Sequence, residues 1–194
     1  MKMNFKLYQI KMFSTMISIV FFCSFAIAKQ THKLPPSNEE FDETAVKPPI
    51  ENEVCFSPGE HCDVKLYKLI QTAQKSIDIA IYDINLDKLV HEVLLASKKI
   101  QVRIIVDRRQ SKGNHSLVPL LIKAGAKVRY GKQRGIMHNK FCIVDSKILE
   151  TGSFNFTNHA SLANQENQIY LTNPGIVGRY KTRFEKMWDE ASEK

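Results

Sequence analysis

Three residues in the second half of the chain have the types and spacing that phosphate chemistry needs. They are His138, Lys140 and Asp145, within the segment GIMHNKFCIVDSKILETGSFNFT. If this segment is a strand, His138 and Lys140 project from the same face, about 7 Å apart along the backbone. The lysine offers a compact positive charge to a phosphoryl oxygen, and the histidine can act as nucleophile or proton donor near neutral pH. The pair predicts a site that holds and attacks a phosphate.

A glycine-containing turn follows and supplies neutral donors. Gly152 permits a close backbone approach, while Ser153 and Asn155 stand two residues apart and can stabilise charge that develops on phosphate. Each feature alone has a plainer explanation, because a His-x-Lys pair is usually surface decoration and an aspartate that ends a strand usually forms a turn. Their order within one short stretch favours chemistry.

The pattern H-x-K-x-x-x-x-D followed by G-S-x-N resembles the signature of the phospholipase D superfamily. The run NQEN is similar to the downstream N-x-E-N of that family, which would add Asn164, Glu166 and Asn167. The resemblance extends over the whole expected folded part, and it is greatest to short, exported, single-motif bacterial phospholipases D and next to small bacterial endonucleases. It implies an α/β fold, a single domain in which a mixed β-sheet is sandwiched between helices.

The resemblance also implies a mechanism that uses neither cofactor nor metal. One histidine attacks phosphorus to give a phosphohistidine, and a second protonates the leaving oxygen and then activates water. Lysines and asparagines would hold the phosphate, Glu166 would orient His138, and Asp145 would support rather than attack. Only one motif is present, and the other histidines lie outside any second copy: His32, His61, His91, His115 and His159. We therefore expect a homodimer with one composite site.

Two substrate classes fit these residues. The first is a membrane phospholipid of the phosphatidylcholine type, hydrolysed to phosphatidate and a free head group. The second is nucleic acid, cut by a metal-independent, non-specific endonuclease. The segment 98–140 holds 12 Lys or Arg and a single acid, Asp107, which favours an anionic partner of either kind. A non-catalytic module that binds anionic membranes is a third alternative, against which the intact motif argues.

The N-terminus predicts export. Residues 1–28 combine early lysines, an apolar run and a terminal Ala-Ile-Ala, which is typical of a secretory signal peptide, although an uncleaved anchor fits too. Residues 29–53 are rich in proline and acidic residues, which predicts a disordered linker. The catalytic domain is expected over residues 54–194, and the protein is expected to be secreted, to the periplasm or beyond.

Cysteine usage agrees with an exported domain. Cys55 and Cys62 are close in sequence and can form a disulfide or remain two free thiols. Cys142 lies in an apolar strand, where a buried thiol is expected. The pair and His61 do not provide the four ligands that a zinc site needs.

Hydrophobic periodicity predicts how the domain positions these residues. Helices and strands alternate from Asp63 to residue 131, and Phe154 and Phe156 beside Asn155 could either line a pocket or anchor the loop. Segments 140–146 and 147–152 predict a strand pair that turns at Ser146. Segment 166–173 predicts a further strand, and segment 174–191 a closing helix with Pro174 in its first turn.

Overall fold

The computed structural model describes residues 41–48, 52–131 and 135–193. The predicted signal peptide and most of the predicted linker lie outside the described residues. One compact unit extends from Asp42 to Lys194. Within the described ranges, no helix is both long and apolar enough to cross a membrane.

The unit is built on a mixed sheet of seven strands in the order β1-β7-β6-β5-β2-β3-β4. Strands β2, β3 and β4 are parallel, whereas β5, β6, β7 and β1 pair antiparallel from β2 outward. The strands are β1 (Glu53–Ser57), β2 (Ser76–Ile81), β3 (Gln101–Val106), β4 (Lys127–Tyr130), β5 (Lys140–Val144), β6 (Ile148–Gly152) and β7 (Glu166–Leu171).

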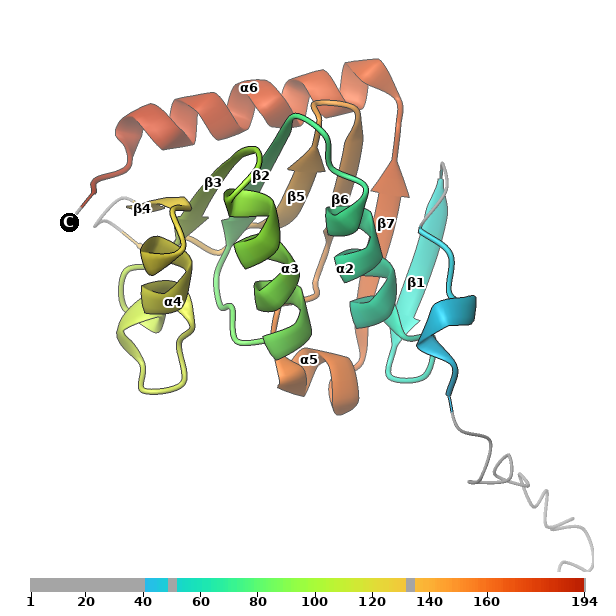
Figure 1. Ribbon diagram of the computed structural model, residues 1–194. Coiled ribbons are helices and arrows are strands. Elements are labelled where there is room, and N and C mark those ends of the chain that lie inside the picture. Colours follow the sequence, from blue (N-terminus) through green and yellow to red (C-terminus); the bar gives the residue numbers. More distant parts are fainter. Residues whose placement is uncertain (1–40, 49–51, 132–134, 194) are drawn as a thin grey trace, which may run out of the picture. The chain divides into compact units, whose positions relative to one another are not determined.

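Helices cover both faces of the sheet, which confirms the predicted fold class (Figure 1). One face packs against α2 (Cys62–Gln71), α3 (Asp87–Ser97) and α4 (Val118–Lys123), and the other against α6 (Pro174–Glu190). A short helix, α5 (Asn158–Leu162), and two 3-10 turns, η1 (Glu43–Ala45) and η2 (Gln110–Lys112), complete the described elements. Burial of alternate strand residues on the two faces gives two apolar cores, because side chains alternate along a strand.

Ion pairs around the buried Asp78 hold α6 against the sheet. Asp78 on β2 is 1% exposed, and Arg103 on β3 donates to it at 2.7 Å. The same guanidinium donates two hydrogen bonds to Glu185, which lowers the pKa of that carboxyl to about 2, and Lys181 pairs with both acids. Arg129 likewise donates to the backbone of α6 at Trp188. Part of the basic segment 98–140 is therefore structural and unavailable to an anionic partner.

The ordered unit begins before Val54, the expected start of the domain. Strand β1 starts at Glu53, and η1 packs on α2 and α3. Glu53 and η1 both lie in the segment that was predicted to be a disordered linker. Glu43 accepts a hydrogen bond from Tyr67 at 2.9 Å and pairs with Lys88. Local composition predicted disorder because it does not register these long-range contacts.

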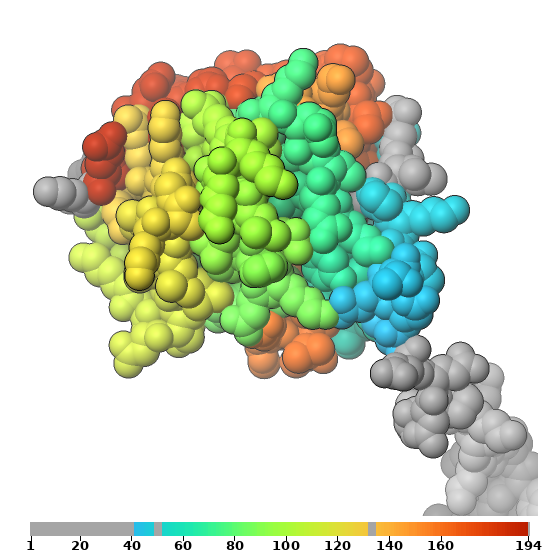
Figure 2. All heavy atoms as spheres, viewed as in Figure 1, coloured from blue at the N-terminus to red at the C-terminus, as the bar shows by residue number. Residues whose placement is uncertain are grey.

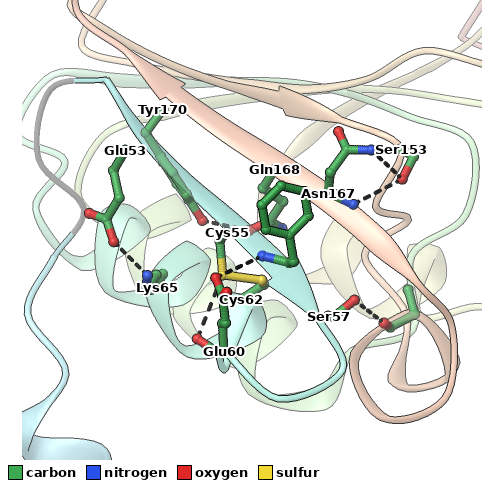
Figure 3. Close-up of a disulfide and its surroundings, with 12 residues drawn as sticks. Glu53, Cys55, Ser57, Glu60, Cys62, Lys65, Ser153, Asn167, Gln168 and Tyr170 are labelled. Atoms are coloured by element: carbon green, nitrogen blue, oxygen red, sulfur yellow. Dashed lines mark hydrogen bonds and ion pairs between the residues drawn. A yellow bond between two sulfur atoms is a disulfide. The ribbon is translucent and has the colours of Figure 1, made fainter.

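The cysteine chemistry resolves the alternative left by the sequence. Cys55 and Cys62 form a disulfide with a sulfur–sulfur distance of 2.09 Å, and it joins edge strand β1 to the start of α2 (Figure 3). Cys142 is a buried free thiol, and burial raises its pKa well above the ordinary value. The disulfide ties the free edge of the sheet to the layer of helices.

Candidate active site

The candidate site lies at the edge of the sheet where the parallel strands end. His138 precedes β5, and Lys140 begins β5 and pairs with Ile81, the last residue of β2. Gly152 ends β6, and Glu166 begins β7. Because β5 and β7 run antiparallel to β6, their first residues and the last residues of β6 meet at one edge. The topology thereby gathers the two motifs, which are more than ten residues apart in the chain.

His138 and Lys140 share a partner that the sequence did not reveal. The ring of Tyr82, just after β2, packs edge-on against His138 with centroids 4.8 Å apart. The Nζ atom of Lys140 lies 5.5 Å from the centroid of the same ring and donates a hydrogen bond to the carbonyl of His138 at 3.2 Å. Tyr82 thus restricts both side chains, while His138 remains exposed to an incoming substrate.

Two opposing effects act on the pKa of Lys140. Partial burial lowers the pKa of its ammonium group, and the Glu166 carboxylate partly offsets this effect. A phosphate that binds here would add a second anion to a lysine that is only half solvated. Such an ammonium group binds a phosphoryl oxygen more strongly than a fully hydrated one, because less water must be displaced.

Gly152 and Ser153 join β6 to β7 through a close backbone approach. A Cβ atom at Gly152 would lie 2.0 Å from the carbonyl oxygen of Asn167, so no other residue fits. The N–H of Ser153 donates to that carbonyl at 3.1 Å. The Ser153 hydroxyl oxygen in turn accepts from the backbone N–H and the side-chain amide of Asn167, at 3.1 and 3.3 Å (Figure 3). Ser153 and Asn167, two of the predicted phosphate-binding residues, are therefore held together as one unit, the Ser153–Asn167 unit.

Glu166 belongs to the same unit, but its hydrogen bonds differ from those expected. It accepts from the Ser153 hydroxyl at 2.5 Å and from the side chain of Asn164 at 2.9 Å. The expected hydrogen bond to His138 is not among its contacts within the described residues. In this structure Glu166 orients Ser153, and the electrostatic link of this carboxylate to the motif is with Lys140.

Asn155 lies between two anchoring phenylalanines. Phe154 and Phe156 are fully buried, so they anchor the loop and do not line a pocket. The side-chain oxygen of Asn155 is buried and has no hydrogen-bond partner among the described residues. The anchored loop therefore fixes the position of Asn155 and keeps its side-chain oxygen out of contact with solvent.

Asp145, expected among the catalytic side chains, is placed elsewhere. It follows the last residue of β5, five residues beyond Lys140, and so lies about 17 Å from the site edge. Its carboxylate accepts hydrogen bonds from the backbone N–H groups of Gln74, Lys75 and Ser76 at 2.7 to 3.2 Å. Partial burial raises the pKa of Asp145, but these hydrogen bonds outweigh it and hold the pKa below its ordinary value.

The position of Asp145 gives it a structural role. Its φ of 54° marks the turn into β6, and its hydrogen bonds hold the loop that enters β2. It therefore fixes the register of β5 against β2 from the end opposite the site. The distance from the site follows from the predicted strand, but the hydrogen-bond partners of Asp145 lie about 70 residues earlier in the chain and only the fold shows them.

Asp107 is a positioning residue that sequence reasoning passed over. It is 5% exposed and follows β3, and its Oδ2 atom accepts a hydrogen bond from the backbone N–H of Met137 at 3.0 Å. Its Oδ1 atom accepts from the N–H groups of Arg109 and Gln110. The carboxylate therefore holds the backbone immediately before His138. The sequence offered one indication of this role, because Asp107 is the single acid in the basic segment 98–140.

Metal ligands do not gather at this edge. Across the part of the chain that the structure describes, no three His, Cys, Asp or Glu side chains are close enough to hold a metal ion. The chemistry that these groups can provide is nucleophilic attack by an imidazole, supported by one cation and by the side-chain amide of Asn167.

Comparison with known proteins agrees with this geometry. Residues 66–188 match the family model described as cardiolipin synthase, PLD-like domain. The chain is 34% identical over 140 residues to a mitochondrial cardiolipin hydrolase of Xenopus tropicalis, covering 70% of this chain and 67% of that protein. It is 35% identical to a phospholipase D of Rickettsia bellii, covering 65% and 63% of the two chains.

A solved structure shares the fold. The phospholipase D family member Nuc from Salmonella typhimurium has a TM-score of 0.67 and 28% identity, and the match covers 72% of this chain and 94% of that one. Of the curated relatives it matches, the chain spans between about half and two thirds of the length.

The comparisons also correct one expectation. Secretion was predicted from the apolar N-terminus, whereas several curated relatives carry the name mitochondrial cardiolipin hydrolase. The prediction of a secreted protein is contradicted by these relatives, which point to mitochondria. An apolar leader after early lysines resembles more than one kind of targeting segment, and the residues that suggested export lie outside the described part of the structure.

Proposed function

We propose, from the premise that this chain belongs to the phospholipase D superfamily, that it hydrolyses the phosphodiester bond of a membrane phospholipid. The products are phosphatidate and the free head group. The observation that carries this proposal is the meeting of His138 and Lys140 with the Ser153–Asn167 unit at one edge of the sheet. A nucleophile, a cation and the amide of Asn167 thereby converge where one phosphate can be held.

The reaction proceeds in two steps. A ring nitrogen of His138 attacks phosphorus, the bond from phosphorus to the head-group oxygen breaks, and a second histidine donates a proton to that oxygen. The second histidine then removes a proton from water, the water oxygen bonds to phosphorus, and the phosphorus–nitrogen bond breaks. Lys140 and the amide of Asn167 stabilise the charge on the phosphoryl oxygens.

The second histidine comes from a second copy of the chain. The sequence holds a single motif, and both steps need an imidazole on each side of the phosphorus atom. A two-fold homodimer supplies both from one gene product. His138 is exposed at the sheet edge, so it is accessible to such a partner.

Phospholipid is the favoured substrate because of the relatives. The proteins of Xenopus tropicalis and Rickettsia bellii are named for cardiolipin and phospholipid cleavage. These names and the net charge of +8 favour an anionic lipid such as cardiolipin as a substrate alongside phosphatidylcholine. The basic segment equally favours the alternative, a non-specific endonuclease, since backbone phosphates attract the same cations.

One parallel assay separates these functions. Purified protein is incubated with a chelator and vesicles of phosphatidylcholine or of cardiolipin, and in a second series with plasmid DNA. Head-group release without nicking supports the proposal, and nicking alone supports the endonuclease. If neither substrate is turned over, the result supports the third alternative, a non-catalytic module that binds anionic membranes. His138→Ala should abolish turnover, whereas His91→Ala, at an exposed histidine on α3, should not.

Mixing wild-type and His138→Ala chains tests the composite site. The two chains are mixed in equal amounts and allowed to exchange subunits, and the activity is compared with that of the same total amount of wild-type protein. If each site needs two histidines, about one quarter of that activity remains, whereas if each chain is self-sufficient, about one half remains. Activity that falls in proportion to the wild-type fraction would contradict the composite site. An acid-labile label on His138 during turnover of radiolabelled lipid tests the covalent step.

A further inference from the structure

Exposed apolar side chains lie at the same edge of the sheet as His138. Leu162, the last residue of α5, is 77% exposed, more than any other large apolar residue among those described. Ile136, two residues before His138, is 55% exposed. Single exposed leucines are ordinary, but two exposed apolar side chains at the end of the sheet that carries the candidate site call for a partner.

Unpaired cations accompany them. Arg109 and Lys112 belong to the segment between β3 and α4, and both side chains are exposed. Neither forms an ion pair with a residue in the described ranges, unlike Arg103 and Arg129 of the same basic segment. Their charges are therefore available to an anionic surface.

Hydrogen bonds place these elements at one edge of the sheet. The side chain of Gln110 donates to Asp83 after β2, and the carbonyl of Asp83 accepts from the N–H of Phe156 just before α5. Asp107 at the end of β3 holds Met137, next to Ile136. In Figure 1, α5 and the segment between β3 and α4 extend from the same end of the sheet, and Figure 2 shows both at the surface there.

We propose that Ile136, Leu162, Arg109 and Lys112 form a membrane-docking edge that binds anionic phospholipid bilayers. This inference rests on the proposed function and adds the surface by which the site reaches its substrate. The phosphodiester of a membrane lipid lies at the boundary of head groups and acyl chains. An edge that inserts two apolar side chains there, with cations at head-group level, brings His138 to the phosphorus without extraction of the lipid.

The apolar pair distinguishes a bilayer from the other anionic partner. A nucleic-acid backbone would engage Arg109 and Lys112 but gains nothing from Ile136 and Leu162. A bilayer engages both kinds of side chain, because apolar burial and attraction to anionic lipid add together. A second copy of the chain could cover the apolar pair, and oligomeric state identifies that case.

The test measures binding to vesicles of phosphatidylcholine mixed with cardiolipin, by co-sedimentation, in the His138→Ala background so that lipid is not consumed. Ile136→Ser with Leu162→Ser should weaken binding on the order of tenfold. Arg109→Gln with Lys112→Gln should weaken it about twentyfold and remove most of its salt dependence. Matched controls are Leu95→Ser and Lys98→Gln with Lys99→Gln, exposed positions at the far end of α3, and these should bind as the parent does.

Three results would overturn the docking edge. They are vesicle affinity of the apolar double variant within about twofold of the parent, equal losses for the control set, or dissociation of a dimer by the apolar double variant in light scattering. Failure of the proposed function would give a different result. The wild-type protein would bind vesicles through this edge but would release no head group.

Discussion

Glu150 on β6 should make the stability of the fold fall as pH rises. Its side chain is fully buried, and neither carboxylate oxygen has a hydrogen-bond partner among the described residues. Its neighbours in the sheet are Cys142 on β5 and Tyr170 on β7, which offer no positive charge. Burial therefore raises the pKa of Glu150 well above its ordinary value of 4.5 and favours the protonated carboxyl in the folded protein.

The magnitude follows from proton linkage. Above about pH 4.5 the unfolded chain releases this proton and the folded chain keeps it, so each pH unit favours the unfolded state by up to about 1.4 kcal/mol. This loss continues until the pH reaches the raised pKa of the folded state. Glu150→Gln removes the titration while keeping the size of the side chain. The free energy of unfolding of the variant, relative to wild type, should therefore increase with pH from about pH 5 until the pH reaches the raised pKa of Glu150 in the folded protein.

Urea unfolding followed by circular dichroism at several pH values measures this difference. Asp189→Asn, at an exposed carboxyl on α6, is the matched control and should leave the pH dependence unchanged. If the difference between Glu150→Gln and wild type is the same from about pH 5 to pH 8, Glu150 is ionised in the folded protein and the reasoning from burial is refuted.

Three further predictions concern the site and the sheet edge. Gly152→Ala should lower turnover by at least about a hundredfold, because its Cβ would meet the Asn167 carbonyl at 2.0 Å and displace the phosphate-binding unit; initial rates and a thermal melt measure activity and folding separately. Asp107→Ala should lower kcat on the order of tenfold, whereas Asp107→Asn should retain most activity because its amide oxygen can still accept from Met137; equal losses for both would contradict the positioning role. Replacing Cys55 and Cys62 with serine should lower the free energy of unfolding by about 2.5 kcal/mol, the chain-entropy value for a loop of this length, and an unchanged urea midpoint would contradict it.

Much of the architecture could be read from local patterns. Alternating apolar residues and turn chemistry predicted the β5–β6 hairpin at Ser146, and Pro174 occupies the first turn of α6 as expected. Helix starts were less accurate. The first helix was expected to start at Asp63, but α2 begins at Cys62, because packing of the apolar face decides where a helix starts.

The residues proposed to carry the chemistry could be identified from type and spacing alone. His138 and Lys140 lie on one short segment, and Gly152 and Ser153 on another, so a linear motif is enough to find them. The sequence also showed that each chain holds a single motif. Those properties are local, since backbone geometry over a few residues determines them.

Only the tertiary structure decided which of these residues meet. It placed Asp145 at the far end of β5, gave Glu166 to Ser153, and brought Tyr82 and Asp107 to the motif from strands that precede it by many residues. It also left Glu150 buried beside Cys142 and Tyr170. Contacts of this kind depend on strand order and register across the sheet, and these are set by the packing of the whole chain, which no short window of sequence contains.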